Sequence, residues 1–171
     1  MKTVLIAYSS KTGTAAECVR MLERELKSLR VTVADLDRGA PELRGCDVVV
    51  FGSSVRFGKL RPAAARFLAE RGGELAALPH GLFLCCGFGH EFEAYSQRLF
   101  PQNLRDSAFA VLSFGGRLRQ EKASWPEKLL LNRVRASILR NDADGAEWTP
   151  ALPDILPENI SRMADALRSA L

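Results

Sequence analysis

The chain has 171 residues, 47% of them hydrophobic, which fits one globular domain spanning residues 1–171 rather than a disordered or fibrous protein. Its formal net charge is +4. This excess is modest and no base-stacking pattern accompanies it, so we expect no nucleic-acid partner. No apolar stretch approaches the roughly 20 residues that cross a bilayer, and no signal peptide is recognisable at the start of the sequence. We therefore expect a cytoplasmic protein.

The cysteines and histidines set limits on disulfide and metal chemistry. The four cysteines are Cys18, Cys46, Cys85 and Cys86. None of them has the Cys-x-x-Cys spacing typical of redox or zinc motifs, so we expect reduced, buried thiols. His80 and His90 lie in no cluster with metal-ligand spacing. The sequence therefore predicts no metal site.

Apolar runs alternate with helical patterns from one end of the chain to the other. Strands are expected at residues 2–8, 30–34, 46–52, 81–86 and 107–114. Helices are expected at residues 15–29, 62–71, 91–100 and 157–171, with Pro62 and Pro157 at first helical positions and Gly72-Gly73 ending the second helix. Strands that alternate with helices of this length predict an α/β fold with right-handed βαβ units and a parallel sheet.

A hydroxyl-rich turn directly follows the first expected strand. Its residues are Ser9, Ser10, Lys11, Thr12, Gly13 and Thr14. Backbone N–H groups and the helix dipole at such a turn bind anions. The spacing is neither that of a Walker loop nor that of the dinucleotide motif. Because hydroxyl side chains at such turns also serve as helix caps, an anion site and a simple cap both remain open.

Two more loops are expected at the carboxyl ends of strands, where parallel α/β sheets bind their ligands. The second loop includes Ser53, Ser54, Val55, Arg56, Phe57 and Gly58, and the third includes Cys86, Gly87, Phe88 and Gly89. Each has an aromatic residue among glycines, which allow close backbone approach to a flat ring that the aromatic can stack on. The three loops predict a site for a phosphorylated planar cofactor. The alternative is that Phe57 and Phe88 only close the ends of the core.

These three loops resemble those of the flavodoxin family, which holds FMN. Ser10-Lys11-Thr12-Gly13-Thr14 matches the family's Ser/Thr-x-Thr-Gly-x-Thr motif as far as Ala15, where a hydroxyl is usual. Either Thr14 takes over that contact or a hydrogen bond is lost, and binding is then weaker than usual. The resemblance implies a doubly wound five-stranded parallel sheet of order 2-1-3-4-5, with helices on both faces. It also implies an insertion near the fifth strand, at about residues 115–148.

The second loop carries a narrower resemblance. Gly52-Ser53-Ser54-Val55-Arg56-Phe57-Gly58 is similar to a loop of menaquinone-dependent protoporphyrinogen dehydrogenases and their flavodoxin-domain relatives. This implies an FMN-dependent oxidoreductase with a quinone acceptor. The short loop after Cys86 departs from those enzymes and leaves the porphyrin substrate open. The alternative is a flavodoxin-type electron carrier that serves redox protein partners and has no substrate of its own.

Arg56 and His90 are the two candidates for a catalytic role. Arg56 would steady an anionic reduced flavin or bind the substrate, and otherwise it would pair with Glu91 or Glu93. His90 would offer a proton near the flavin edge, although a poised base needs an orienting group. Without a visible partner, an ordinary loop histidine is the alternative.

A basic segment between Arg117 and Arg140 distinguishes this chain from ordinary flavodoxins. It has seven lysine and arginine residues against two glutamates, with Trp125 and several leucines among them. A basic helix of this kind is typical of peripheral contact with the inner face of a membrane. It would also suit an acidic substrate, because arginine binds carboxylates well. The third alternative is that its apolar residues pack against the domain itself.

Overall fold

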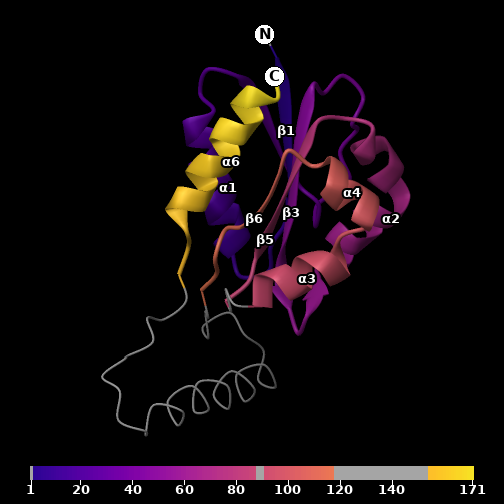
Figure 1. Cartoon of the computed structure of the whole chain (residues 1–171), viewed down its shortest axis with the longest axis vertical. Helices are drawn as coiled ribbons and strands as arrows, with labels where there is room; N and C mark the ends of the chain where they lie inside the picture. The colour runs from indigo at the N-terminus through magenta and orange to yellow at the C-terminus, as the bar shows by residue number, and fades with distance from the viewer. Residues whose placement is uncertain (1, 88–90, 118–153) are drawn as a thin grey trace, which may run out of the picture.

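The computed structural model describes residues 2–87, 91–117 and 154–171. The strands are β1 (Thr3–Ser9), β2 (Arg30–Asp35), β3 (Val48–Arg56), β4 (Lys59–Leu60), β5 (His80–Cys85) and β6 (Ala110–Ser113). The helices are α1 (Thr14–Glu25), α2 (Pro62–Ala76), α3 (Phe92–Leu99), α4 (Gln102–Ser107) and α6 (Pro157–Ser169). Figure 1 shows α1 and α6 on one face of the sheet and α2 and α4 on the other.

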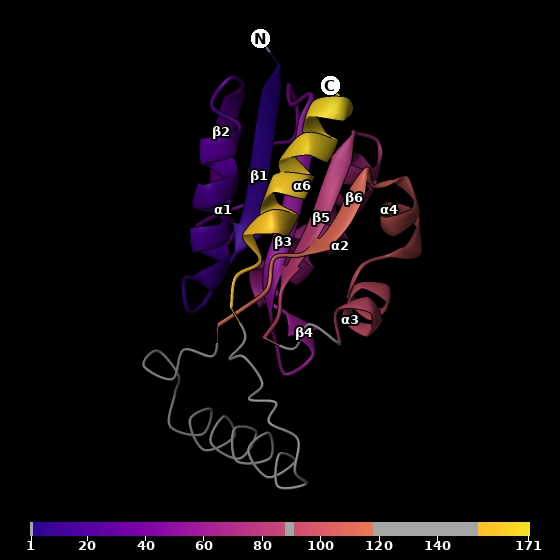
Figure 2. The same cartoon turned by 60° about the vertical axis from the view of Figure 1, so that its left-hand side comes forward.

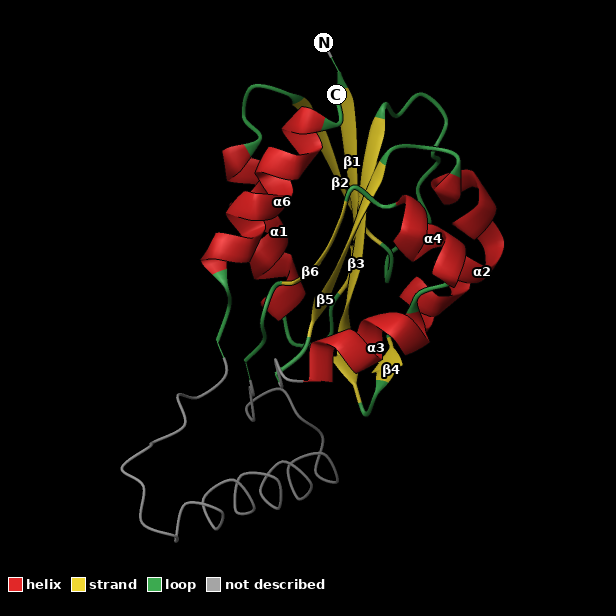
Figure 3. Cartoon of the chain, viewed as in Figure 1, coloured by secondary structure: helices red, strands yellow, loops and turns green. Residues whose placement is uncertain are grey.

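Five parallel strands form the sheet in the order β2-β1-β3-β5-β6. This confirms the predicted order, with the short strand β4 as an addition that pairs antiparallel with the end of β3. Figure 2 shows β4 beyond the main sheet, at the end where the parallel strands terminate. The layers of helix, sheet and helix are visible in Figure 3. The carboxyl ends of all five parallel strands therefore lie along one edge.

The central strands are buried on both faces, which explains their continuous apolar sequences. Every residue of β5 is buried, and so are the first seven residues of β3. Side chains alternate between the two faces. Val50 and Phe83 pack on the side of α1 and α6, whereas Phe51 and Leu82 pack on the side of α2 and α4. The sheet thus separates two apolar cores.

Several element boundaries differ from the predicted ones. Helix α2 continues through Gly72 and Gly73 to Ala76, because burial of Phe67 and Leu75 outweighs the roughly 1 kcal/mol that each helical glycine costs. Strand β3 extends to Arg56 because β4 gives its last two residues a pairing partner. The short helix α4 was not expected; it ends at Ser107, the first residue of the region expected as the fifth strand, and β6 begins at Ala110. Across the described ranges, no helix is long and apolar enough to cross a membrane.

Candidate cofactor site

The strand register brings the three predicted loops to neighbouring positions. Ser9 at the end of β1 pairs with Ser53 in β3, and Ser54 pairs with Cys85 at the end of β5. The chain leaves β1 into the hydroxyl loop and leaves β5 toward the loop that begins at Cys86. The edge of the sheet therefore collects the segments that the sequence singled out.

The hydroxyl loop ends at an open helix terminus. Gly13 adopts a left-handed conformation with φ of 88° and forms the N-cap of α1, and its N–H donates to Ser10 Oγ at 3.2 Å. The first intrahelical bond runs from the N–H of Glu17 to the carbonyl of Gly13 at 3.0 Å. The N–H groups of residues 14–16 precede that bond and so have no intrahelical acceptor. Such a set of donors at the positive end of the helix dipole favours the binding of an anion.

A buried hydroxyl adds to this arrangement. Thr14 is only 3% exposed, and its Oγ1 finds no hydrogen-bond partner among the residues that the structure describes. A buried polar atom left without a partner costs about 1–3 kcal/mol. Ala15 is fully buried in the core beside Cys18 and Val19. Ala15 therefore contributes to core packing, and the hydroxyl available for a ligand is that of Thr14.

An ion pair that sequence reasoning missed links the hydroxyl loop to the second loop. Asp37, after β2, accepts hydrogen bonds from Ser9 Oγ at 2.6 Å and from the N–H of Ser10 at 3.2 Å. Its other oxygen contacts Arg61 Nη2 at 3.2 Å, and the N–H of Arg61 donates to Ser53 Oγ at 3.2 Å. The sequence feature that could have revealed this pair is the position of Asp37 just after β2, because the strand order places β2 beside β1. These contacts fix the two loops relative to each other.

The second loop is a tight β-hairpin rather than an irregular loop. Arg56 of β3 pairs with Lys59 of β4, and the turn between them has Phe57 at φ 49° and Gly58 at φ 69°. Two left-handed residues in a two-residue turn are typical of type I′. This corrects the expectation for Ser53, Ser54, Val55 and Arg56, which belong to the strand.

The hairpin presents an aromatic ring to solvent. Phe57 is 61% exposed, and the Arg56 guanidinium lies 5.9 Å from its ring centre. The alternative that Phe57 closes the core is therefore wrong. A bulky residue at positive φ is strained, and strain of this kind clusters at functional sites. Glu91 accepts a hydrogen bond from the Tyr95 hydroxyl and Glu93 accepts one from Gln97, and the pairing of Arg56 with either acid stays a prediction.

Helix α3 supports the tip of the hairpin. Arg98 Nη2 donates to the carbonyl oxygen of Gly58 at 2.9 Å, and its guanidinium lies 5.2 Å from the ring centre of Tyr95. The Tyr95 hydroxyl donates to Glu91, and this bond raises the pKa of Tyr95 to about 12. A Cβ at Gly58 would lie 2.6 Å from Arg98 Nη2, so a side chain there would displace the end of the Arg98 side chain. Helix α3 thus holds the turn of the hairpin in place.

The third loop is described only at its start. Cys86 is buried, with its sulfur 3.9 Å from Ser113 Oγ. Phe88, Gly89 and His90 lie outside the described residues, so Phe88 as a ring contact and His90 as a proton donor stay predictions. Within the described ranges, no three His, Cys, Asp or Glu side chains are grouped so as to hold a metal ion.

The cysteines are free thiols, as expected. Three of them are buried, and Cys46 is partly exposed. Cys85 Sγ lies 3.9 Å from Cys18 Sγ. The hydrogen bond to Cys18 and burial both raise the pKa of the Cys85 thiol well above its ordinary value. Such a thiol is protonated and unreactive at neutral pH.

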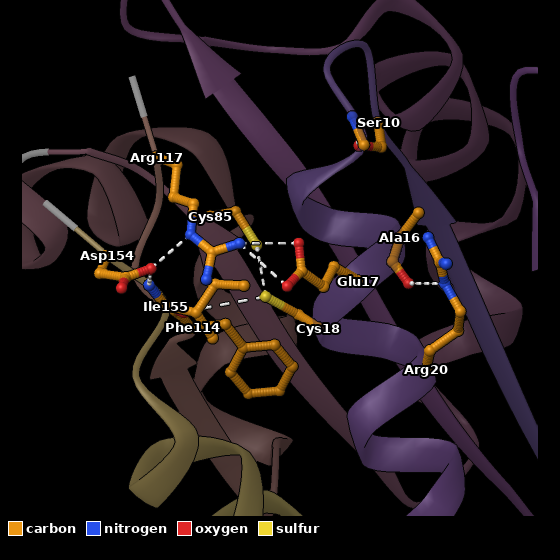
Figure 4. A network of polar contacts seen from close by, with 11 residues as sticks. Ser10, Ala16, Glu17, Cys18, Arg20, Cys85, Phe114, Arg117, Asp154 and Ile155 are labelled. Atoms are coloured by element: carbon orange, nitrogen blue, oxygen red, sulfur yellow. Dashed lines mark hydrogen bonds and ion pairs between the residues drawn. The ribbon is translucent and has the colours of Figure 1, made fainter. Parts of the chain in front are cut away.

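The basic segment is described only at Arg117. Its guanidinium is bound by Glu17 in the first turn of α1 and by Asp154, as Figure 4 shows. Arg117 is therefore engaged with the domain itself. The rest of the segment up to Arg140 lies outside the described residues, so its role in membrane contact stays a prediction.

Comparison with known proteins decides the family. The flavodoxin domain family matches residues 5–144. The chain belongs to the flavodoxin domain family. No curated protein matches this flavodoxin-domain chain.

Solved structures agree with the fold of this flavodoxin-domain chain. A short-chain flavodoxin associated with a nonstandard PDU bacterial microcompartment is 12% identical, with a TM-score of 0.60 over 100% of both chains. A Fusobacterium nucleatum flavodoxin bound to flavin mononucleotide is 16% identical, with a TM-score of 0.51 over 69% of this chain and 72% of that one. The flavodiiron protein from Giardia intestinalis is 15% identical, with a TM-score of 0.51 over 99% of this chain and 38% of that one.

Proposed function

We propose that this flavodoxin-domain chain binds FMN and acts as a redox protein. The observation that carries the proposal is the open start of α1, where the first N–H groups have no intrahelical acceptor and the buried Thr14 hydroxyl has no hydrogen-bond partner among the described residues. An FMN phosphate fits this set, because its oxygens accept hydrogen bonds and carry the charge that a helix N-terminus favours. When bound, FMN supplies the redox chemistry, and the protein supplies binding, orientation and electrostatics.

The proposed binding residues divide between the phosphate and the ring. Ser10, Thr12 and Thr14, with the backbone around Gly13, would hold the phosphate. The hairpin tip would flank the isoalloxazine ring through Phe57, which is exposed on the same edge of the sheet. The backbone at Cys86 and Gly87 would approach the ring from the neighbouring strand end. This division follows from the register of β1, β3 and β5.

For the reaction, we propose an oxidoreductase similar to menaquinone-dependent protoporphyrinogen dehydrogenase. Two features support it: Arg56 beside the exposed Phe57 ring offers a cation at the site, and the net charge of +4 favours acidic substrates. The second candidate is an electron carrier for redox proteins, which the same exposed ring favours, because partners can reach the hairpin tip directly. A quinone acceptor and contact with a membrane surface belong to the first candidate.

One experiment separates the two candidates. The FMN-loaded protein is mixed anaerobically with protoporphyrinogen, and bleaching of the flavin absorbance reports reduction. The reduced protein is then mixed with a menaquinone analogue, and recovery of the absorbance reports reoxidation. The oxidoreductase predicts both steps, and Arg56→Met should slow the first one. If dithionite reduces the bound flavin but neither protoporphyrinogen nor the menaquinone analogue reacts with it, the oxidoreductase is ruled out and the electron carrier is supported.

A further inference from the structure

Arg117 connects two parts of the chain that lie far apart in sequence. Its Nη1 donates to both carboxylate oxygens of Glu17, each at 2.9 Å, and its Nε donates to Asp154. In Figure 4 the guanidinium lies between the two carboxylates. These bonds raise the pKa of Arg117, Asp154 contributing most and Glu17 next. Arg117 is therefore a permanent positive charge at this place.

The backbone holds Arg117 firmly in position. Gly115 and Ile155 form an antiparallel bridge, the N–H of Gly116 donates to the carbonyl of Asp154 at 3.1 Å, and the N–H of Leu156 donates to the carbonyl of Phe114 at 3.0 Å. We call residues 114–117 and 154–156 the stem. A Cβ at Gly116 would lie 2.7 Å from the carbonyl carbon of Cys86. The stem thus packs against the start of the third loop while Arg117 reaches α1.

Glu17 creates an electrostatic difficulty for an anion site. It belongs to the first turn of α1, the same turn that holds the open N–H groups and the unpartnered Thr14 hydroxyl. A carboxylate there interacts favourably with the helix dipole, but it repels a phosphate bound at the same terminus. Because Glu17 and Arg117 are each about one-third exposed, solvent screens the repulsion in part, and a positive partner offsets much of the rest.

We propose that Arg117 is a positioning residue of the phosphate site, which neutralises Glu17 and holds its carboxylate so that α1 can receive a dianionic phosphate. The inference rests on the proposed FMN site. It makes Arg117 selective for the phosphate-bearing cofactor, since riboflavin places no charge at this terminus. The affinity for FMN then depends on the position of the stem, because the stem carries Arg117.

The test compares variants in full-length protein stripped of bound flavin. Arg117→Met should weaken FMN binding about three- to tenfold, the effect of one charge near a phosphate in a water-rich setting, and should leave riboflavin binding within about twofold. The defect should shrink at high salt. Arg117→Met with Glu17→Gln should bind FMN about as tightly as the wild type, because the repelling charge is gone as well.

Arg71→Met is the matched control. Arg71 also bridges two carboxylates, those of Glu42 and Glu74. It belongs to the second half of α2, which lies on the opposite face of the sheet from α1. Its loss should leave FMN affinity unchanged. The proposal is overturned if Arg117→Met binds FMN like the wild type, if FMN and riboflavin affinity fall equally, or if Glu17→Gln restores nothing.

A second measurement separates this inference from the proposed function. Inorganic phosphate is titrated into the flavin-free protein, and NMR records the amide signals of residues 14–16. We expect shifts in the wild type and weaker shifts in Arg117→Met. If the wild type binds no FMN but shows this Arg117-dependent response, the proposed function fails and the inference stands. If FMN binds selectively over riboflavin and Arg117→Met changes neither measurement, the inference alone fails.

Discussion

Arg61 and Asp37 form an ion pair, Nη2 to Oδ1 at 3.2 Å, that joins the segment before α2 to the turn after β2. The pair stands between the hydroxyl loop and the hairpin strand, because Asp37 also accepts from Ser9 and Ser10 while the backbone of Arg61 donates to Ser53. Both side chains are mostly buried, at 24% and 30% exposure. The geometry of the cofactor site therefore depends on residues that do not belong to its predicted loops.

Replacing Asp37 tests this dependence. Asp37→Ala removes the acceptor for Ser9 and Ser10, and we expect a loss of about 1–2 kcal/mol of unfolding free energy, the worth of charge-assisted hydrogen bonds in a partly exposed setting. FMN affinity should fall too, because the start of the phosphate loop is released. Urea denaturation and flavin titration measure the two effects. Glu42→Ala removes a carboxylate that is 76% exposed, and it should change neither quantity.

Phe57 offers a test of stored strain. Phe57→Gly removes a bulky side chain from a left-handed position at φ 49°, so we expect the flavin-free protein to gain about 1 kcal/mol in unfolding free energy. Flavin affinity should fall in the same variant, since the ring that we propose to flank the cofactor is lost. A variant that is more stable and binds FMN as tightly as the wild type would show that the ring has no role in binding.

Gly52 has no room for a side chain. A Cβ at this position in β3 would overlap the ring of Phe83, which is fully buried and stacked on Phe114 at 4.3 Å between centroids. We expect Gly52→Ala to cost about 3 kcal/mol or more by overpacking. Gly73→Ala is the opposite case, since nothing lies within 4 Å of the added Cβ. It should stabilise α2 by about 1 kcal/mol, and thermal unfolding of both variants checks the contrast.

The Tyr95–Glu91 hydrogen bond predicts a pH dependence at the alkaline end. It raises the pKa of Tyr95 from 10.0 to about 12 in the folded protein. Because the folded pKa lies above the unfolded one, the contribution to stability is complete below about pH 10 and is lost as pH rises toward 12. Denaturation at several pH values should show the wild type losing stability faster than Tyr95→Phe in this window. Parallel curves for the two proteins would contradict the assignment.

The sheet could be predicted from the sequence because its signals are local. The apolar runs of β3 and β5 and the helical stripe of α1 come from burial on both faces of the sheet or on one side of a helix. The ends of elements were less predictable. Gly72 and Gly73 remain helical through packing that no local pattern reveals, and α4, with six residues, is too short for a periodic signal.

The site was predictable where single loops carry the chemistry and not where distant segments meet. The hydroxyl loop before α1 and an aromatic residue near the end of β3 follow from residue type and position after a strand, whereas the hairpin that exposes Phe57 was not predicted. The Asp37–Arg61 pair spans 24 residues, and the Arg117–Glu17 pair spans 100. Both depend on the order of strands and on the path of the stem. The left-handed conformation of Phe57 was equally hidden, because glycine or asparagine is the usual signal for it.

Titration of the flavin-free protein with FMN and with riboflavin, followed by quenching of flavin fluorescence, tests the central claim most directly. We predict saturable one-to-one binding of FMN that is clearly tighter than that of riboflavin, because the start of α1 contributes donors for the phosphate. Thr14→Val should reduce the difference between the two flavins by removing the buried hydroxyl. No quenching by FMN, or equal affinity for both flavins in the wild type, would contradict the assignment of this terminus as the phosphate site.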